Sequence, residues 1–545
     1  MRRFLTLHHP AHSRNWYGRG MWQADTFYSL ALGNARARPN AFALRDRERR
    51  LTWHELVSWV DAVADFLHEK GLVRGDRISL LLSNRAEAAA LFLACSRNGY
   101  VFIPALHRNF PAATVLDIAR RMQTRLLILE NGFGATPDLL ASTFRSALPE
   151  HVVLPADRST GSQFPTLGTV AQNLAPVDPD PDRVSILGLT SGTTGAPKGV
   201  MHSDNTVLAN ARDLVRDWGH HPQTVLCCLS PISHLIAWIA AAQMLLAGGE
   251  LVMNDPPPGT SILDWILATH ATYVKGVPTH AIDILQEQRS RGMKSLGAVK
   301  IFYLAGSQIP RVTAEALAAQ GVVPQNVYGM TENLSHCSTR PDDGIETILE
   351  TVGRASSAYE IRIFKVDDRD TPAAHGETGE IAGRGACMML GYYADQASTE
   401  NSYNRDGWFM SGDLGRLTSD GSLQIVGRVK DIIIRGGHNI HPAQIEELAM
   451  RQPGISKAAA FGIPDARLGE RICLAIVPSA AAPRYADVLE SLRRDGLSKY
   501  DLPEFLLTLA EMPTTHNGKI LKRRLVEMVV SGEVRPVPAA SMKDA

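Results

Sequence analysis

The chain has 545 residues, which at roughly 150 residues per domain corresponds to three to four domains or to fewer large ones. Lys plus Arg and Asp plus Glu number 56 each, so the formal net charge is zero and a general nucleic-acid binder, which carries a basic surplus, is excluded. Hydrophobic residues make up 45% and charged residues 21%, as in folded globular enzymes rather than disordered chains. The six cysteines show no CxxC spacing, which argues against structural zinc and a disulfide framework and favours a cytoplasmic protein.

The N-terminal segment MRRFLTLHHP has too short an apolar stretch for a signal-peptide core. The most apolar region, which begins at Leu235, is interrupted by Gln243 and is shorter than the roughly 20 residues that span a bilayer. We therefore expect a buried helix there and no integral membrane association.

Apolar strand-like runs alternate with helical patterns through the middle of the chain. Strands are predicted at Val184–Leu189, Val225–Leu229, Glu250–Met253, Thr272–Val277 and Val299–Leu304, and helices after a cap at Ser203 or Asp204, at Leu235–Ala247 and at Ile262–Thr269. Such alternation predicts crossover connections and a largely parallel sheet covered by helices.

The pattern changes after about Gly353. Short strands at 361–366, 379–385 and 422–428 predict a small β-subdomain. From about Lys430 a last unit mixes strands (456–463, 471–477) with helices at Pro442–Met450 and Tyr485–Arg494. The main boundary is predicted at Arg428–Asp431.

The segment Thr190 to Gly199 (TSGTTGAPKG) joins a predicted strand to a loop of small hydroxyl residues and glycines with one lysine. Backbone N–H groups and hydroxyls of such a loop approach phosphate oxygens without a Cβ clash, and the lysine supplies charge. It is not a Walker A loop, and by itself a Gly/Thr-rich turn is more often only a turn.

This segment resembles the phosphate loop of the adenylate-forming superfamily, which includes acyl-CoA synthetases, peptide-synthetase adenylation domains and luciferases. Four further motifs resemble those of the family and stand in its order: YGMTE (328–332), SGDLG (411–415), GRVKD with RGGHNI (427–440), and the PxxxxGK segment from Pro513 to Lys519. Five ordered motifs are specific where any one alone would be weak, and the resemblance covers roughly residues 25–530.

The resemblance implies an α/β fold: a large N-terminal domain (1–428) of two α/β-layered sheets with a β-subdomain (about 353–428), then a mobile α+β C-terminal domain (429–545). It also implies a two-step ligase. MgATP and a carboxylate give an acyl-adenylate and pyrophosphate, and the thiolate of coenzyme A then displaces AMP to give a thioester. ATP, Mg²⁺ and coenzyme A are thus the implied cofactors.

The family's functional residues map onto matching positions of this chain. Lys519 would bridge the acyl carboxylate and the α-phosphate during adenylation, Glu332 would help to hold Mg²⁺, and Thr331 would offer its hydroxyl to a phosphate oxygen. Asp413 and Arg428 would bind the ribose. The remaining nucleotide-binding positions are Thr190, Ser191, Gly192, Thr193, Thr194, Gly195, Lys198, Tyr328 (as an adenine platform) and Gly329.

The family's C-terminal domain rotates about a hinge residue, which matches Lys430 here. One pose would bring in Lys519, and the other would bring Gly436 and Gly437 to the coenzyme A channel. Without this context, Lys430 and Lys519 read as ordinary surface lysines, the latter beside the basic run 522–524.

The predicted acyl pocket is lined by His234, Trp238, Gly276, Ala305, Gly306, Ser307, Met330 and Ser335. The segments 276–280, 305–307 and 333–337 hold no Lys or Arg for a second carboxylate, so an apolar monocarboxylic acid is favoured: medium-chain, alicyclic such as cyclohexanecarboxylate, or aromatic. A core histidine and ordinary helix packing remain alternatives for His234 and Trp238.

Two rival functions stay open: an adenylating enzyme that loads a carrier protein, and a non-catalytic sensor that binds nucleotide or acyl-adenylate. A homodimer and a lysine acyltransferase acting on Lys519 are further expected partners. Acylation would neutralise the lysine that adenylation needs.

Overall fold

The computed structural model of the chain describes residues 4–104, 106–158, 164–190, 197–479, 483–514 and 520–538. The chain divides into two compact units. The first comprises residues 1–361, 383–403 and 421–423, and the second comprises residues 362–382, 404–420 and 424–545. Within the described ranges, no helix combines the length and hydropathy needed to cross a membrane.

The largest sheet of the first unit has nine strands in the order β15-β14-β13-β12-β11-β9-β10-β1-β2. The strands are β1 (Phe42–Arg45), β2 (Arg50–Thr52), β9 (Val225–Cys228), β10 (Glu250–Met253), β11 (Tyr273–Gly276), β12 (Ile301–Ala305), β13 (Val323–Met330), β14 (Leu334–Ser338) and β15 (Arg354–Ala355). The six central strands run parallel, and β2, β14 and β15 are antiparallel to their neighbours.

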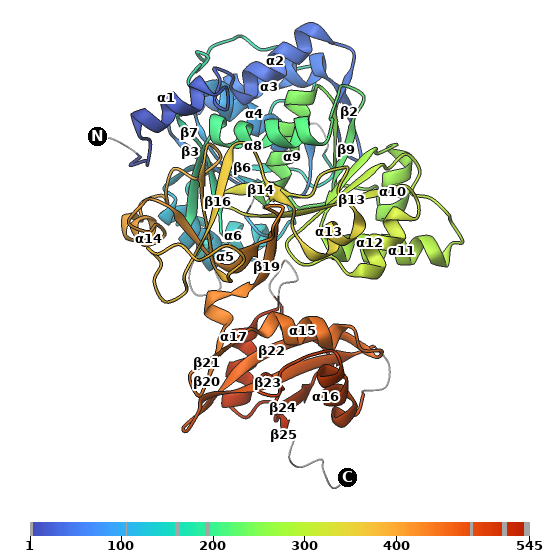
Figure 1. The fold of residues 1–545 in the computed structure, drawn as a ribbon. Helices are drawn as coiled ribbons and strands as arrows, with labels where there is room; N and C mark the ends of the chain where they lie inside the picture. Colours follow the sequence, from blue (N-terminus) through green and yellow to red (C-terminus); the bar gives the residue numbers. More distant parts are fainter. Residues whose placement is uncertain are drawn as a thin grey trace. The chain divides into compact units, whose positions relative to one another are not determined.

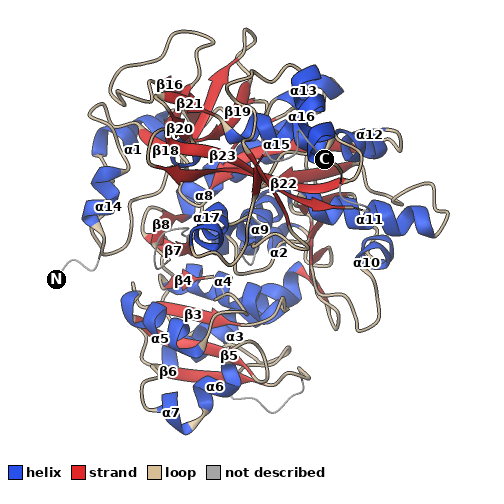
Figure 2. Ribbon diagram, turned by 90° about the horizontal axis from the view of Figure 1, so that it is seen from below, coloured by secondary structure: helices blue, strands red, loops and turns tan. Residues whose placement is uncertain are grey.

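A second sheet of this unit has six strands in the order β6-β5-β3-β4-β7-β8, which Figure 2 shows following one another. They are β3 (Arg77–Leu81), β4 (Val101–Ile103), β5 (Thr124–Glu130), β6 (Glu150–Leu154), β7 (Val184–Leu189) and β8 (Gly199–Ser203). All pairs are parallel except β7 with β8. The sequence did not predict β8, since the hydrogen bonds that make it a strand come from β7 and not from its own pattern.

Helices cover both sheets. Those of the first unit are α1 (Pro10–Gly18), α2 (Phe27–Ala37), α3 (Trp53–Glu69), α4 (Ala86–Asn98), α5 (Ala112–Arg121), α6 (Thr136–Leu140), α7 (Ser142–Arg145), α8 (Asp204–Asp217), α9 (Leu235–Ala247), α10 (Ile262–Ala268), α11 (Pro278–Ser290), α12 (Arg311–Ala318), α13 (Ile345–Glu350) and α14 (Gln396–Asn401). Helix α8 contacts β7 and β8 of one sheet and β14 of the other, and α9 packs against α8 and against β9, β10 and β14 (Figure 1). Helices α10 to α13 cover the opposite face of the nine-stranded sheet.

Helix α9 begins and ends where its sequence predicts. It is apolar except at Gln243, and Gly248 ends it in the left-handed conformation at φ +69°. It is a buried 13-residue helix, which confirms the prediction of a core element.

A four-stranded sheet has the order β16-β17-β18-β19, with β16 (Tyr359–Phe364), β17 (Gly379–Gly385), β18 (Phe409–Leu417) and β19 (Leu423–Arg428). The rest of the second unit contains a mixed sheet in the order β21-β20-β23-β24-β25, with β22 also paired to β23. Its elements are η1 (Val429–Asp431), β20 (Ile433–Arg435), β21 (His438–Ile440), β22 (Ile455–Asp465), β23 (Gly469–Pro478), β24 (Phe505–Thr508), β25 (Val537–Pro538), α15 (Pro442–Met450), α16 (Tyr485–Arg494) and α17 (Lys522–Val530).

The predicted α/β class is confirmed. The basic run 522–524 opens helix α17, which the sequence did not predict. There Lys522 pairs with Glu446 at 2.6 Å, and Leu525 is fully buried.

Candidate functional site

The two ends of the predicted phosphate loop are joined by their own hydrogen bonds. The Thr190 N–H donates to the Lys198 carbonyl at 3.1 Å, and the Lys198 N–H donates to the Thr190 hydroxyl oxygen at 3.1 Å. These two hydrogen bonds join the residue that follows β7 to the residue that precedes β8. Ser191, Gly192, Thr193, Thr194 and Gly195 lie outside the described residues.

The predicted magnesium ligand Glu332 follows directly on β13 and is partly exposed. The Tyr392 hydroxyl donates to Glu332 Oε1 at 2.8 Å, and the Met389 N–H donates to the Glu332 carbonyl at 2.7 Å. Burial, followed by the negative charge of Glu332, raises the pKa of Tyr392, so its hydroxyl stays protonated and donates. These contacts fix the direction in which the carboxylate points.

Thr331 is held by a buried histidine. His202 Nε2 lies 2.8 Å from the Thr331 carbonyl oxygen, and Nδ1 lies 3.0 Å from the Thr206 hydroxyl. Since the carbonyl only accepts, the hydrogen must be on Nε2. Burial lowers the pKa of His202 to about 4, so the ring is neutral at physiological pH.

A glycine lets the Thr331 turn approach the loop. A Cβ at Gly188, which lies on β7 before the phosphate loop, would meet Thr331 Cγ2 at 2.8 Å.

Tyr392 links the phosphate loop to Glu332. Lys198 Nζ lies 4.6 Å from the centroid of the Tyr392 ring, whose hydroxyl binds Glu332. The loop lysine and the predicted magnesium carboxylate therefore share one neighbour, and the structure brings these two motifs together.

Tyr328 and Gly329 precede this turn on β13. The Tyr328 ring is 8% exposed and packs edge-on against His336 at 5.1 Å between centroids, so its role as an adenine platform stays a prediction. A Cβ at Gly329 would overlap the Leu334 carbonyl oxygen, which explains the glycine by close approach of two backbone segments.

The predicted acyl-pocket residues come from α9 and from the carboxyl ends of the sheet strands. His234 is the residue before α9 and its ring lies 6.3 Å from that of His107. The Trp238 indole donates to the Ile232 carbonyl at 2.9 Å and packs on Phe102 at 4.6 Å. Trp238 is therefore a core side chain that also lines a cavity of about 20 Å³.

Most of the other predicted wall residues lie at or just after the carboxyl ends of β11, β12 and β13, and Ser335 lies near the start of the antiparallel strand β14. Gly276 is buried against His280, and Ala305 and Met330 are partly exposed, whereas Gly306 and Ser307 are exposed. The Ser335 hydroxyl lies 2.7 Å from that of Tyr303, and its backbone is held by both polar atoms of Asn210. A wall built at the carboxyl ends of parallel strands is the usual place for a ligand in this class of fold.

In the second unit, the predicted ribose ligands form an ion pair. Arg428 Nε lies 2.8 Å from Asp413 Oδ1, across the adjacent strands β18 and β19. Gly412 has φ +73°, and its N–H donates to Glu380 Oε1 at 3.0 Å. The motif therefore lies within strand β18, where the positive φ of Gly412 interrupts the regular backbone and the carboxylate of Asp413 is already oriented by a guanidinium.

Lys430 lies in the short helix η1 and is exposed; desolvation and then the positive charge of Arg428 lower its pKa. Gly436 and Gly437 form the two-residue turn of the β20–β21 hairpin, since Arg435 pairs with His438. Both glycines have positive φ, +57° and +85°, which this type of tight turn requires. Lys519 lies outside the described residues.

Tyr392 and His202 were not predicted from the sequence. Tyr392 contacts Glu332 from 60 positions away and His202 contacts Thr331 from 129 positions away, and neither lies in a recognisable motif. The sequence indicates a helix cap at Ser203, next to His202, but it does not indicate that His202 contacts Thr331.

The chain is similar to known proteins over most of its length. Residues 33–393 match the family model "AMP-binding enzyme", and residues 444–519 match "AMP-binding enzyme C-terminal domain". A medium-chain fatty-acid–CoA ligase of Escherichia coli strain K12 is 28% identical over 92% of this chain and 90% of the relative. A 2-hydroxy-7-methoxy-5-methyl-1-naphthoate–CoA ligase of Streptomyces carzinostaticus is 30% identical over 93% of both chains.

Among solved structures, ATP-bound MatB from Rhodopseudomonas palustris superposes with a TM-score of 0.81. It is 26% identical, and the match covers 92% of this chain and 99% of that one.

Proposed function

Because this chain belongs to the family of AMP-binding enzymes, we propose that it converts a carboxylic acid to its acyl-CoA thioester in two steps. In the first, a carboxylate oxygen attacks the α-phosphorus of ATP and pyrophosphate leaves. In the second, the coenzyme A thiolate attacks the acyl carbonyl carbon and AMP leaves. Both relatives named above are acid–CoA ligases, which favours coenzyme A over a carrier protein as acceptor.

The observation that carries the proposal is the shared neighbour of Lys198 and Glu332. Adenylation needs phosphate charge to be neutralised in a fixed geometry, with little covalent help from the protein. Tyr392 orients the Glu332 carboxylate by a 2.8 Å hydrogen bond and contacts Lys198 through its ring. Positive and negative groups of two motifs thus converge where a polyphosphate and its cation would lie.

The residues fit a magnesium ion. Among the described residues no three His, Cys, Asp or Glu side chains form a metal cage, and Mg²⁺ bound by one carboxylate, phosphate oxygens and water needs none. Glu332 would hold the ion, which when bound neutralises phosphate charge. Thr331 would donate its hydroxyl to a phosphate oxygen, and His202 keeps the Thr331 backbone in place.

Lys519 would supply the charge between the carboxylate and the α-phosphate in adenylation, and Lys430 would be the hinge that exchanges it for the Gly436–Gly437 turn in thioester formation. The two glycines present a Cβ-free turn, which suits a narrow channel.

The test is AMP formation from MgATP and coenzyme A with acetate, hexanoate, decanoate, palmitate, benzoate, cyclohexanecarboxylate and a cinnamate. We expect AMP release that depends on both the acid and coenzyme A for at least one of these acids. Release that is unaffected by coenzyme A would point to a carrier-protein acceptor, and ATP binding without any release would point to a sensor.

Lys519→Ala separates catalysis from binding. We expect it to abolish acid-dependent pyrophosphate release and to leave ATP binding, measured by calorimetry, mostly intact. Equal loss of both would assign Lys519 a structural role and contradict the proposal.

A further inference from the structure

Four polar or polarisable residues form a row across one face of the nine-stranded sheet. Lys275 on β11 pairs in register with Cys228 on β9 and with Tyr303 on β12, and Tyr303 pairs with Gln325 on β13. All four are 4% exposed or less. The row lies on the side of the sheet that faces α9, because Lys275 reaches Gln243 of that helix.

The amine of Lys275 is fully buried and has no carboxylate partner among the described residues. Its Nζ donates to Gln243 Oε1 at 2.7 Å and lies 4.4 Å from the centroid of the Tyr303 ring. An ammonium group has three N–H donors, and this arrangement gives a hydrogen-bond acceptor to one of them. Burial lowers the pKa of Lys275 to about 7.

The surrounding cluster also contains a buried donor without an acceptor. The Gln325 side-chain oxygen accepts from Tyr273, whereas no described residue accepts from its Nε2. The hydroxyls of Tyr303 and Ser335 share a single hydrogen bond at 2.7 Å. A buried donor without an acceptor is destabilising, so this region is suited to a ligand that brings an acceptor oxygen.

The cluster adjoins the predicted acyl pocket. Lys275 immediately precedes Gly276, and Tyr303 lies two residues before Ala305, so both are close to the carboxyl ends of their strands. Tyr303 holds the hydroxyl of the predicted wall residue Ser335. Cys228, the neighbour of Lys275, lines the small cavity of about 20 Å³ together with Trp238.

Resting on the proposed function, we propose that Lys275 and Tyr303 form a specificity site for an acceptor oxygen on the acid, remote from its reacting carboxylate. A hydroxyl, phenolate, carbonyl or second carboxylate would accept from the N–H groups of Lys275 that lack a partner. The preferred substrate is then an acid with an apolar body and one such oxygen, rather than the wholly apolar acid that the sequence favoured.

The site is tested with matched acids. Acid-dependent pyrophosphate release is measured at saturating MgATP for benzoate and the 2-, 3- and 4-hydroxybenzoates, for hexanoate and hexanedioate, and for cyclohexanecarboxylate and its 4-oxo derivative. We expect at least one oxygen-bearing acid to exceed its parent in kcat/KM by about tenfold or more, because a site built to bind a polar group rejects the analogue that lacks it. A higher kcat/KM for the apolar parent in every pair of acids would overturn the inference.

Lys275→Met should remove this preference by raising KM for the oxygen-bearing acid more than KM for the apolar parent, so that the ratio of the two kcat/KM values falls by about tenfold or more. The matched control is Lys300→Met, an exposed lysine just before β12, which should keep the wild-type ratio. An unchanged ratio in folded Lys275→Met, with folding checked by circular dichroism, would overturn the inference.

Two further measurements cover the remaining outcomes. If Lys275→Met does not fold, Tyr303→Phe keeps the ring against Lys275 and removes one hydroxyl, and it should still lower the ratio. If no acid turns over, the proposed function fails, and calorimetric binding of the hydroxybenzoates against benzoate tests the site by itself. Equal affinities there would overturn the inference.

Discussion

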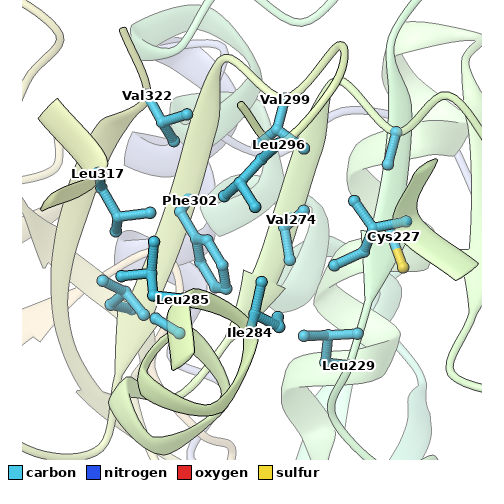
Figure 3. Packing of buried hydrophobic residues seen from close by; sticks show 14 of the residues in the cluster. Cys227, Leu229, Val274, Ile284, Leu285, Leu296, Val299, Phe302, Leu317 and Val322 are labelled. Carbon is cyan, nitrogen blue, oxygen red and sulfur yellow. The ribbon is translucent and has the colours of Figure 1, made fainter. Parts of the chain in front are cut away.

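The two faces of the nine-stranded sheet are built from alternate residues of the same strands, yet they differ in chemistry. Cys227, Val274 and Phe302 point to one face and pack on Ile284 and Leu285 of helix α11, as Figure 3 shows. Their immediate neighbours Cys228, Lys275 and Tyr303 point to the other face and meet α9. Both faces are buried. The α11 side is mainly apolar, with buried amides at Asn326 and Gln288, whereas the α9 side carries the amine of Lys275 and the hydroxyl of Tyr303.

We relate this difference to two roles: the α11 side stabilises the fold, and the α9 side is suited to recognise the substrate. The α11 side forms one continuous apolar cluster, which contributes through burial and close packing. Polar groups on the α9 side cost free energy to bury and are not needed to close the core. We therefore expect substitutions on the α11 side to change stability, and those on the α9 side and at its strand ends to change substrate selection and rate.

Phe302→Ala is expected to have the largest effect on stability. Phe302 is fully buried, and removing its ring should lower the free energy of unfolding by about 3–5 kcal/mol through lost burial and a residual cavity. Urea denaturation followed by circular dichroism measures it. Tyr303→Phe on the opposite face is the matched control and should cost about 1 kcal/mol, so equal losses would contradict the comparison.

Glu332→Gln, just after the carboxyl end of β13, should lower kcat for pyrophosphate release by about 10²-fold with little change in Tm, because it removes charge at the phosphates.

Tyr392→Phe should have a smaller effect, lowering kcat by about tenfold. It should also raise the Mg²⁺ concentration needed for half-maximal rate, since the carboxylate of Glu332 loses one orienting hydrogen bond. A Tyr392→Phe enzyme with wild-type magnesium dependence would show that this tyrosine does not position Glu332.

Acid should weaken the first unit through its buried histidines. Burial lowers the pKa of His202 to about 4 and those of His220 and His336 to about 3, below the unfolded value of about 6.5. Between these values the unfolded chain binds protons and the folded one does not. Stability is therefore complete above pH 6.5 and falls as pH decreases, by up to about 1.4 kcal/mol per pH unit for each histidine. Urea unfolding of the wild type and of His220→Gln at pH 7, 6 and 5 measures this, and an unchanged slope in the variant would refute the assignment.

Lys275→Met should have the smallest effect on stability. The buried amine of Lys275 has no carboxylate partner in the part of the chain that the structure describes, and replacing a buried ionisable group by an apolar side chain of similar length is often neutral or stabilising. We therefore expect a Tm no lower than that of the wild type. A fall as large as that of Phe302→Ala would show that Lys275 is a structural element of the core. Differential scanning calorimetry provides the measurement.

Much of the fold followed from local pattern. The bounds of α9, β10, α15 and α16 agree with the expectation, because each has a uniform or periodic apolar pattern and a clear end signal. Strand β8 and helix α17 were missed. The first depends on pairing with β7, and the second begins with three basic residues whose apolar partners follow later in the chain.

Sequence alone determined the family and the positions of its motifs, because the small residues, glycines and charges of those motifs stand at fixed places along the chain. Only the tertiary structure decided that Tyr392 joins Lys198 to Glu332, that His202 holds Thr331, and that Lys275 faces α9 rather than α11. The physical reason is register. Strand pairing aligns residues that are dozens of positions apart, and a shift of a single residue would exchange the two faces of the sheet.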